Sequence, residues 1–293
     1  MYILYIFNMH GKGATMLKVE NLCKSYGKFK LDNVSFELPA GYIMGFIGKN
    51  GAGKTTTIKS ILNFVTPDSG KIEILGKDSR KYETELKKEI GFSLEPISYY
   101  EKTRIKNIVN VYKRFFDTFD EKYYKELMAR FNVDENKKVC ELAAGMKTKL
   151  SLALALSHGA KLIIFDEPTS GLDPVSRGEL CDLFREVVES GDKSILFSTH
   201  ITSDLDKCAD YMIYIHDGRL VLKGTKDEII DSHRVVGGSK EQLEEVRDRL
   251  IGYKENPFGF MGLAKTEDIG ALGLSVEVPT MEDIMIYYEE ATK

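Results

Sequence analysis

The chain of 293 residues has few cysteines, no long apolar run and no excess of basic residues. Its four cysteines are scattered, with no Cys-x-x-Cys pair, which argues against a zinc site or a disulfide framework. No apolar run reaches the roughly 18–20 residues that span a bilayer, and no basic residue precedes the apolar opening Met1–Phe7. The net charge of −4 argues against a protein that mainly binds nucleic acid. We therefore expect a cytoplasmic protein without a nucleic-acid partner.

One glycine-rich stretch carries most of the functional information. Residues Gly48–Thr55 match the phosphate-binding P-loop, in which Gly, four free positions and Gly-Lys-Ser/Thr follow one another. The glycines let the backbone close around phosphate oxygens, Lys54 is expected to reach the β- and γ-phosphates, and the Thr55 hydroxyl to ligate Mg²⁺. The residues predicted to contact ATP here are Gly48, Lys49, Asn50, Gly51, Ala52, Gly53, Lys54, Thr55 and Thr56.

The pattern of apolar runs predicts an α/β fold. Near-continuous apolar strands alternate with helices, which indicates a parallel sheet covered on both faces. Charged and aromatic residues at helical spacing over residues 80–135 predict a helical insert, with one helix from Lys102 to Phe116. The strands expected in the chain are Leu17–Leu22, Asn33–Leu38, Tyr42–Ile47, Leu162–Phe165, Ser194–Phe197 and Tyr211–Ile215. Further helices are expected at Thr57–Leu62, Lys147–Leu156, Ser239–Ile251 and Met281–Glu290.

Three polar side chains follow the ends of predicted strands. Asp166, after the strand Leu162–Phe165, stands where a P-loop protein coordinates Mg²⁺. The neighbouring Glu167 can orient or deprotonate an attacking water. His200 follows another strand, at the sheet edge where α/β proteins bind ligands. Its position alone leaves a catalytic and a purely structural histidine equally open.

These motifs, in this order, resemble the nucleotide-binding subunit of an ABC transporter, and the resemblance covers about residues 17–225. The run Phe165–Pro174 is highly specific to that family. The resemblance implies that Tyr26 stacks on adenine, that Asp166 and Glu167 belong to the Walker B motif, and that His200 contacts the γ-phosphate. It also implies a D-loop made of Ser170, Gly171, Leu172 and Asp173.

Two sites depart from the usual pattern of this family. The signature motif, usually Leu-Ser-Gly-Gly-Gln, reads here Leu142, Ala143, Ala144, Gly145 and Met146. The serine hydroxyl is absent, and a lost hydrogen bond to a charged group is worth about 1.5–3 kcal/mol. Glu95 stands where the family has its Q-loop glutamine, and its carboxylate can ligate Mg²⁺ directly. Both departures resemble the bacitracin-export-type branch of the family.

The resemblance implies an ATPase that works in pairs. Two cassettes would pack head to tail around two ATP, each covering the other's nucleotide with its signature loop, as a homodimer or a heterodimer. The motion would drive separate transmembrane permease subunits at the inner face of the membrane, through a surface that includes Tyr99 and Tyr100. Simple packing is an equally open explanation for these two tyrosines. The alternatives are a soluble or a regulatory ABC ATPase with weak hydrolysis; a P-loop GTPase is disfavoured because no Asn-Lys-x-Asp motif is found.

The expected organisation has three parts. Residues 1–15 are expected to be a disordered extension or the result of an upstream start, because Met16 is followed directly by a strand-like segment. Residues 16–232 form the predicted ATPase domain, with an antiparallel β subdomain and a helical subdomain at about 96–155. Residues 233–293 form a small α+β extension of acidic balance, either a solvated surface or a dimerising or regulatory part.

Overall fold

The computed structural model describes residues 14–94, 101–270 and 273–291. The chain forms two compact units, one ending at Val221 and the other beginning at Leu222. Each unit is described by itself. Among the described residues, no helix combines the length and the apolar character needed to cross a bilayer.

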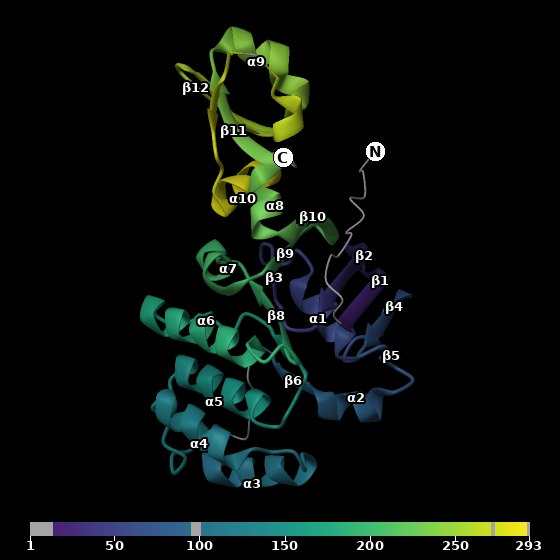
Figure 1. Ribbon diagram of the computed structural model, residues 1–293, viewed down its shortest axis with the longest axis vertical. Helices are drawn as coiled ribbons and strands as arrows, with labels where there is room; N and C mark the ends of the chain where they lie inside the picture. The colour runs from purple at the N-terminus through teal and green to yellow at the C-terminus, as the bar shows by residue number, and fades with distance from the viewer. Residues whose placement is uncertain (1–13, 95–100, 271–272, 292–293) are drawn as a thin grey trace. The chain divides into compact units, whose positions relative to one another are not determined.

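A six-stranded sheet is the centre of the first unit (Figure 1). Its strand β3 (Ile43–Ile47) is fully buried and runs parallel to β8 (Ser194–Thr199) and to β9 (Tyr211–His216). Next to β8 lie β7 (Leu162–Phe165) and β6 (Ile90–Ser93), also in parallel register. The strand order is β10-β9-β3-β8-β7-β6, with β10 at Arg219–Thr225. The predicted buried parallel sheet is therefore confirmed.

A second, antiparallel sheet packs over one side of the first. Its long strands β1 (Thr15–Tyr26) and β2 (Phe29–Pro39) pair along most of their length, and β1 also pairs with β4 (Ser69–Ile74). The order is β2-β1-β4-β5, with β5 at Lys77–Asp78. Helix α1 (Lys54–Ile61) lies between the two sheets, where Ile58 and Ile61 join one buried core with residues of both (Figure 1).

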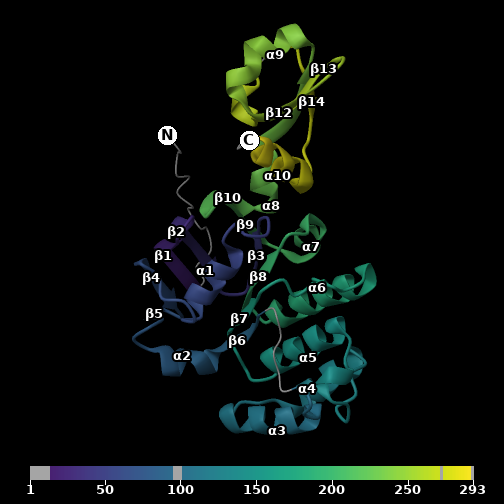
Figure 2. The same cartoon turned by 180° about the vertical axis from the view of Figure 1, so that it is seen from behind.

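Helices cover the remaining faces of the first unit. On the opposite side of the parallel sheet from α1 lie α6 (Pro174–Val188) and α7 (Thr202–Cys208), and α7 contacts β3 (Figure 2). Helix α2 (Glu83–Glu89) leads into β6. A helical group follows, made of α3 (Ile105–Phe115), α4 (Glu121–Arg130), a 3-10 turn (Val139–Glu141) and α5 (Ala144–Leu156).

Three helix starts differ from the sequence prediction by three residues. Helix α1 begins at Lys54 rather than Thr57, directly after the left-handed Gly53. Helix α3 begins at Ile105 rather than Lys102, after the extended residue Arg104. Helix α5 begins at Ala144 rather than Lys147, because Ala143 already takes the extended conformation of an N-cap and the amide of Lys147 bonds its carbonyl. Three of the five signature residues, Ala144, Gly145 and Met146, therefore form the first turn of α5 instead of a loop before it.

The second unit is a small α+β structure, as expected for the extension. Its antiparallel sheet has the order β12-β13-β11-β14. The predicted helix Ser239–Ile251 is wrong at its end: α9 stops at Val246, and Leu250 already begins a strand because it pairs with Ala264. The bounds are α8 Lys226–Asp231, β11 His233–Gly238, α9 Lys240–Val246, β12 Leu250–Asn256, β13 Gly259–Lys265, β14 Ser275–Glu277 and α10 Met281–Glu290, with 3-10 turns at Arg247–Arg249 and Thr266–Asp268.

Candidate nucleotide-binding site

The P-loop joins β3 to α1 by a backbone that only glycine can follow. Gly51 and Gly53 have φ angles of 85° and 119°, in the left-handed region. A Cβ added at Gly48 would lie 2.4 Å from the carbonyl oxygen of Ile215, so the neighbouring strand β9 approaches too closely for any side chain. The amide of Gly218 bonds the carbonyl of Ala52 at 2.9 Å and fixes the loop from outside. Helix α1 starts at Lys54, so its first amides face the loop as an anion-binding end.

Lys54, Glu167 and His200 form a continuous chain of polar contacts. The Lys54 Nζ lies 3.1 Å from Glu167 Oε1 as an ion pair, although the two groups are not aligned for a hydrogen bond. The same ammonium donates to the Gly48 carbonyl at 2.6 Å. The other carboxylate oxygen of Glu167 lies 2.8 Å from the Nδ1 of His200. The structure thus brings together three residues that the sequence places 33 to 146 positions apart.

The backbone at Glu167 is unusual for a residue with a side chain. Its φ is 50°, a conformation that costs free energy outside glycine. The Glu167 amide donates to Ser198 Oγ at 2.9 Å, a contact that holds the turn after β7 against the end of β8. This arrangement directs the carboxylate toward Lys54 and His200.

A second polar cluster lies beside the first. Thr55 Oγ1 donates to Asp166 Oδ2 at 2.7 Å, and Ser198 Oγ donates to Asp166 Oδ1 at 2.5 Å. A threonine hydroxyl and a carboxylate are the hard oxygen ligands that Mg²⁺ takes in proteins, where it keeps several waters and binds substrate phosphates as well. The donor set therefore fits a magnesium ion held by Thr55 and Asp166.

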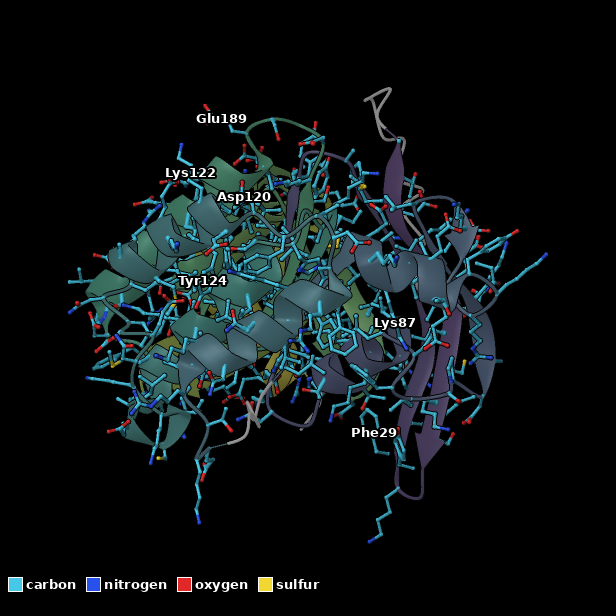
Figure 3. The ribbon with its side chains drawn as sticks, turned by 90° about the horizontal axis from the view of Figure 1, so that it is seen from below. Phe29, Lys87, Asp120, Lys122, Tyr124 and Glu189 are labelled. Atoms are coloured by element: carbon cyan, nitrogen blue, oxygen red, sulfur yellow. The ribbon has the colours of Figure 1, made fainter. Side chains whose placement is uncertain are left out.

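Both clusters open into one cleft of about 920 Å³. Its lining includes Tyr26 and Phe29, which come from the two ends of the β1–β2 turn (Phe29 is labelled in Figure 3). Tyr26 is 47% exposed, so its ring is available to a flat apolar ligand, and Lys24 Nζ lies 5.4 Å from the ring centre. The remaining lining residues are Lys49, Asn50, Gly51, Gly53, Lys54, Thr55, Thr56, Ala144, Lys147, Thr148, Asp166 and Glu167.

The signature residues reach this cleft through the start of α5. Ala144 lines the cleft, and Ala143 is an N-cap that has no side-chain acceptor for the first amides. Gly145 is close to the D-loop, because a Cβ there would lie 3.0 Å from Leu172 Cδ2. The altered signature segment therefore offers backbone and apolar surface where the usual serine offers a hydroxyl.

The predicted D-loop is a structured turn between β7 and α6. The Ser170 amide bonds the Glu167 carbonyl at 3.1 Å, and Gly171 has a φ of 74°. Asp173 caps α6 by accepting from the amides of Val175 and Ser176, and the Ser176 contact lowers the pKa of its carboxyl below the ordinary value. Asp173 thus has a structural contact within its own chain.

Some predicted residues are not described by the structure, and some residues of the site were not predicted. Glu95, Tyr99 and Tyr100 lie outside the described residues. Sequence reasoning missed Ser198, which contacts both Walker B residues, and Phe29, the second aromatic of the cleft. No distinctive sequence pattern marks Ser198, which lies two positions before His200. Phe29 could have been found, because it lies three residues after Tyr26 across a tight turn.

Comparisons with known proteins agree with this geometry. Residues 31–170 match the family model described as "ABC transporter". The chain is 34% identical to the bacitracin transport ATP-binding protein BcrA of Bacillus licheniformis over 71% of this chain and 69% of that protein. The chain belongs to the ATP-binding subunits of ABC transporters. As a member of this family it is an ATPase, and the prediction of its family and fold class is confirmed.

Two further relatives extend the match. The lantibiotic transport ATP-binding protein SrtF of Streptococcus pyogenes is 35% identical over 82% of this chain and 99% of its own length. A solved ATP-binding subunit of an ABC transporter superposes with a TM-score of 0.67 at 29% identity, covering 73% of this chain and 92% of that one. The P-loop ABC cassette is thus the fold of this ABC ATPase, and ATP is its ligand.

Proposed function

We propose that this ABC ATPase hydrolyses ATP in a head-to-tail dimer and drives separate transmembrane permease subunits. The observation that carries the proposal is the position of Glu167, between Lys54 and His200 in the nucleotide cleft. A carboxylate so placed can accept a proton from water, while a lysine and a histidine on either side can stabilise phosphate charge.

The ion pair between Lys54 and Glu167 defines what ATP binding has to change. Lys54 is 5% exposed, and in its present position its ammonium neutralises the proposed base. When Lys54 turns to the β- and γ-phosphates, Glu167 becomes free to accept a proton from the attacking water. The water oxygen then bonds the γ-phosphorus, the bond to the bridging oxygen breaks, and ADP and phosphate leave. His200 keeps Glu167 oriented through its Nδ1 and contacts the γ-phosphate.

Thr55 and Asp166 are the residues that would hold Mg²⁺, with Glu95 as a third proposed ligand. The ion, when bound, neutralises charge on the β- and γ-phosphates. Ser198 supports this role because its hydroxyl fixes one oxygen of Asp166, which leaves the other oxygen and Thr55 facing the cleft. Tyr26, with Phe29 also in the lining of the cleft, would stack on the adenine.

The exposure of the P-loop supports the proposed dimer. Lys49, Asn50 and Gly51 are exposed to solvent, so a phosphate bound there leaves room for a cover from another chain. In the head-to-tail arrangement the partner supplies it with its own Ala143, Ala144, Gly145 and Met146, while the D-loop from Ser170 to Asp173 lies at the shared boundary. ATP binding would close the dimer, and hydrolysis would reopen it. Both a homodimer and a heterodimer fit this arrangement.

An exposed aromatic pair supports a protein partner. Phe64 and Phe92 are 54% and 42% exposed, and their rings make an edge-to-face contact at 5.5 Å. Phe92 lies on the edge strand β6, just before the segment that contains Glu95, Tyr99 and Tyr100. Two large apolar rings on the surface mark a place where another protein can dock. We assign this surface to the permease, which would bring the ATPase to the inner face of the membrane.

A second candidate is a regulatory ABC ATPase that hydrolyses slowly. The N-cap Ala143 favours it, because the first turn of α5 lacks the serine hydroxyl of the usual signature. The intact chain of Lys54, Glu167 and His200 opposes it. Nucleic acid is not among the expected partners.

The domain organisation stays a prediction. It consists of an ATPase domain at 16–232, a small extension at 233–293, and residues 1–15 as a segment outside both.

Replacement of Glu167 by Gln tests the proposal. This change keeps the shape of the side chain but removes its basicity, so ATP binding should persist while turnover falls by about 100-fold or more. The variant should also accumulate as an ATP-dependent dimer in analytical ultracentrifugation. Asp182→Asn, an exposed carboxylate on α6, is the matched control and should behave as the unmodified protein. Unchanged turnover in Glu167→Gln would refute its assignment as the base.

A further inference from the structure

We propose that Arg177 is a positioning residue that holds His200 in place by tying the first turn of α7 to α6. The proposal rests on the proposed function, because it explains the support of a histidine that we place at the γ-phosphate. Helix α7 starts at Thr202, so Ile201 alone separates it from His200. The His200 side chain is 45% exposed, so packing fixes it little and its place depends on the backbone that leads into α7.

The guanidinium of Arg177 connects the starts of the two helices. Its Nε donates to Asp204 Oδ1 at 2.9 Å, and one terminal nitrogen donates to the same oxygen at 2.5 Å. That nitrogen also donates to Ser203 Oγ at 2.9 Å. Ser203 and Asp204 belong to the first turn of α7, whereas Arg177 lies one turn after Asp173, the N-cap of α6 and the last residue of the D-loop. The planar fork of arginine thus contacts two consecutive residues at once, which the single ammonium of a lysine does less well.

The carboxylate in this contact is deeply buried. Asp204 is 0% exposed, and among the described residues its Oδ2 has no hydrogen-bond partner. A buried carboxylate needs a cation beside it, and an oxygen left without a hydrogen bond costs free energy. Such a pair adds little stability compared with apolar side chains of similar size, but it restricts how the two helices can meet. The pair therefore serves the geometry of α7 more than the stability of the fold.

Two thiols contact the same residue through its backbone. Cys181 lies one turn after Arg177, so both face α7, and the two helices pack against each other (Figure 2). The thiol of Cys181 donates to the Asp204 carbonyl at 3.8 Å, and that of Cys208 donates to it at 3.4 Å. Thiols are weak donors, so the orientation of Asp204 depends mainly on the charged contact with Arg177.

The path from Asp204 to the reacting groups is short. The Asp204 amide bonds the Ile201 carbonyl at 3.2 Å, and the Ile201 amide bonds Thr199 Oγ1 at 3.0 Å, so the backbone on both sides of His200 is held. His200 Nδ1 in turn lies 2.8 Å from Glu167 Oε2. A displacement of the first turn of α7 would therefore carry His200 away from Glu167.

The test removes the ion pair while the two helices stay packed. In the double variant Arg177→Met/Asp204→Leu, apolar side chains replace both charges, an exchange that often preserves stability. Its ATP turnover should fall about tenfold to hundredfold with an unchanged KM for ATP, because the reacting groups are misplaced while binding is kept. Arg185→Met removes an exposed arginine of the same helix, which pairs with Asp182 at 3.9 Å, and as the matched control it should have no effect.

A double-mutant cycle shows whether the effect passes through His200. His200→Ala alone should lower turnover about 100-fold, and the apolar pair should lower it no further in that background. A role in stability alone would lower turnover by the same factor in both backgrounds, together with the melting temperature. Arg177→Lys keeps the charge without the fork. It replaces the apolar pair in the same cycle if that pair does not fold, and its loss of turnover should likewise disappear when His200 is absent.

Two results would overturn the proposal: turnover of the apolar pair within about twofold of the unmodified protein, or an equal loss with and without His200. If Glu167→Gln and His200→Ala also keep the turnover of the unmodified protein, the proposed function is wrong and the role of Arg177 falls with it. If these two variants lose turnover and the apolar pair does not, the assignment of Arg177 alone is wrong.

Discussion

The starts of α1 and α5 line the same cleft, and they are built in opposite ways. At α1, side chains fix the geometry: Lys54 pairs with Glu167, and Thr55 bonds Asp166. At α5, the N-cap Ala143 contributes no side-chain hydrogen bond, and Lys147 in the next turn pairs with the exposed Glu101. One helix start is thus fixed by a side-chain network, whereas the other presents mainly backbone to the cleft. We expect the first to tolerate little change and the second to be altered without loss of the fold.

The largest effect is expected at the start of α1. Lys54→Ala removes a phosphate ligand and leaves Glu167 without its cation, so ATP turnover should fall about 100- to 1,000-fold. Measurement of phosphate release and of nucleotide binding checks this, with Lys87→Ala on α2 as a matched loss of a surface lysine (labelled in Figure 3). Turnover within tenfold of the unmodified protein would show that the network at α1 is as tolerant as we expect α5 to be.

A pair of glycine variants compares the two helix starts directly. Gly48→Ala places a Cβ 2.4 Å from the carbonyl oxygen of Ile215, which cannot move without shifting strand β9. Gly145→Ala places a Cβ 3.0 Å from the end of the flexible Leu172 side chain. We expect Gly48→Ala to lower the free energy of unfolding by about 1–3 kcal/mol, and Gly145→Ala by less. Urea denaturation measures both. Equal losses would remove the proposed difference in tolerance.

Ser198→Ala tests the support behind the α1 network. The hydroxyl contacts Asp166 and Glu167 together and is fully buried, so its loss should cost about 1–3 kcal/mol of stability and lower turnover about tenfold. Ser157→Ala is a matched buried serine that bonds within its own helix at the end of α5. It should affect stability alone, and an equal loss of turnover there would argue against a special role for Ser198.

The smallest effect concerns the far end of α5. His158 is buried against Tyr112 and Phe116, and burial lowers the pKa of its imidazole below 6.5. The unfolded chain then binds a proton that the folded one does not, so stability should decrease as pH falls from about 6.5 through the lowered pKa. His158→Gln should flatten this dependence in urea titrations between pH 7.5 and 5. His233, also buried with a lowered pKa, remains in both proteins, so the difference between their slopes reports His158. Identical slopes would contradict the assignment.

Local patterns predicted the parts of the fold that depend on short stretches of chain. The buried strand Leu162–Phe165 was placed at its observed bounds, because four consecutive apolar residues before Asp166 leave little choice. The end of the helix after Ser239 was predicted wrongly. Leu250 and Ile251 fit either an amphipathic helix or a strand, and pairing with β13 decided for the strand. A single sequence contains no signal for such a long-range pairing.

The sequence by itself determined the P-loop, the Walker B carboxylates and the family, because each depends on residue types at fixed spacing. Only the tertiary structure decided which groups meet. It placed Lys54 against Glu167, and it put the Ser198 hydroxyl between the Asp166 carboxylate and the Glu167 backbone amide. It also brought the starts of α1 and α5 to one cleft. These contacts join strand ends and helix starts that are distant along the chain, and they form because the parallel sheet brings the carboxyl ends of its strands to one edge.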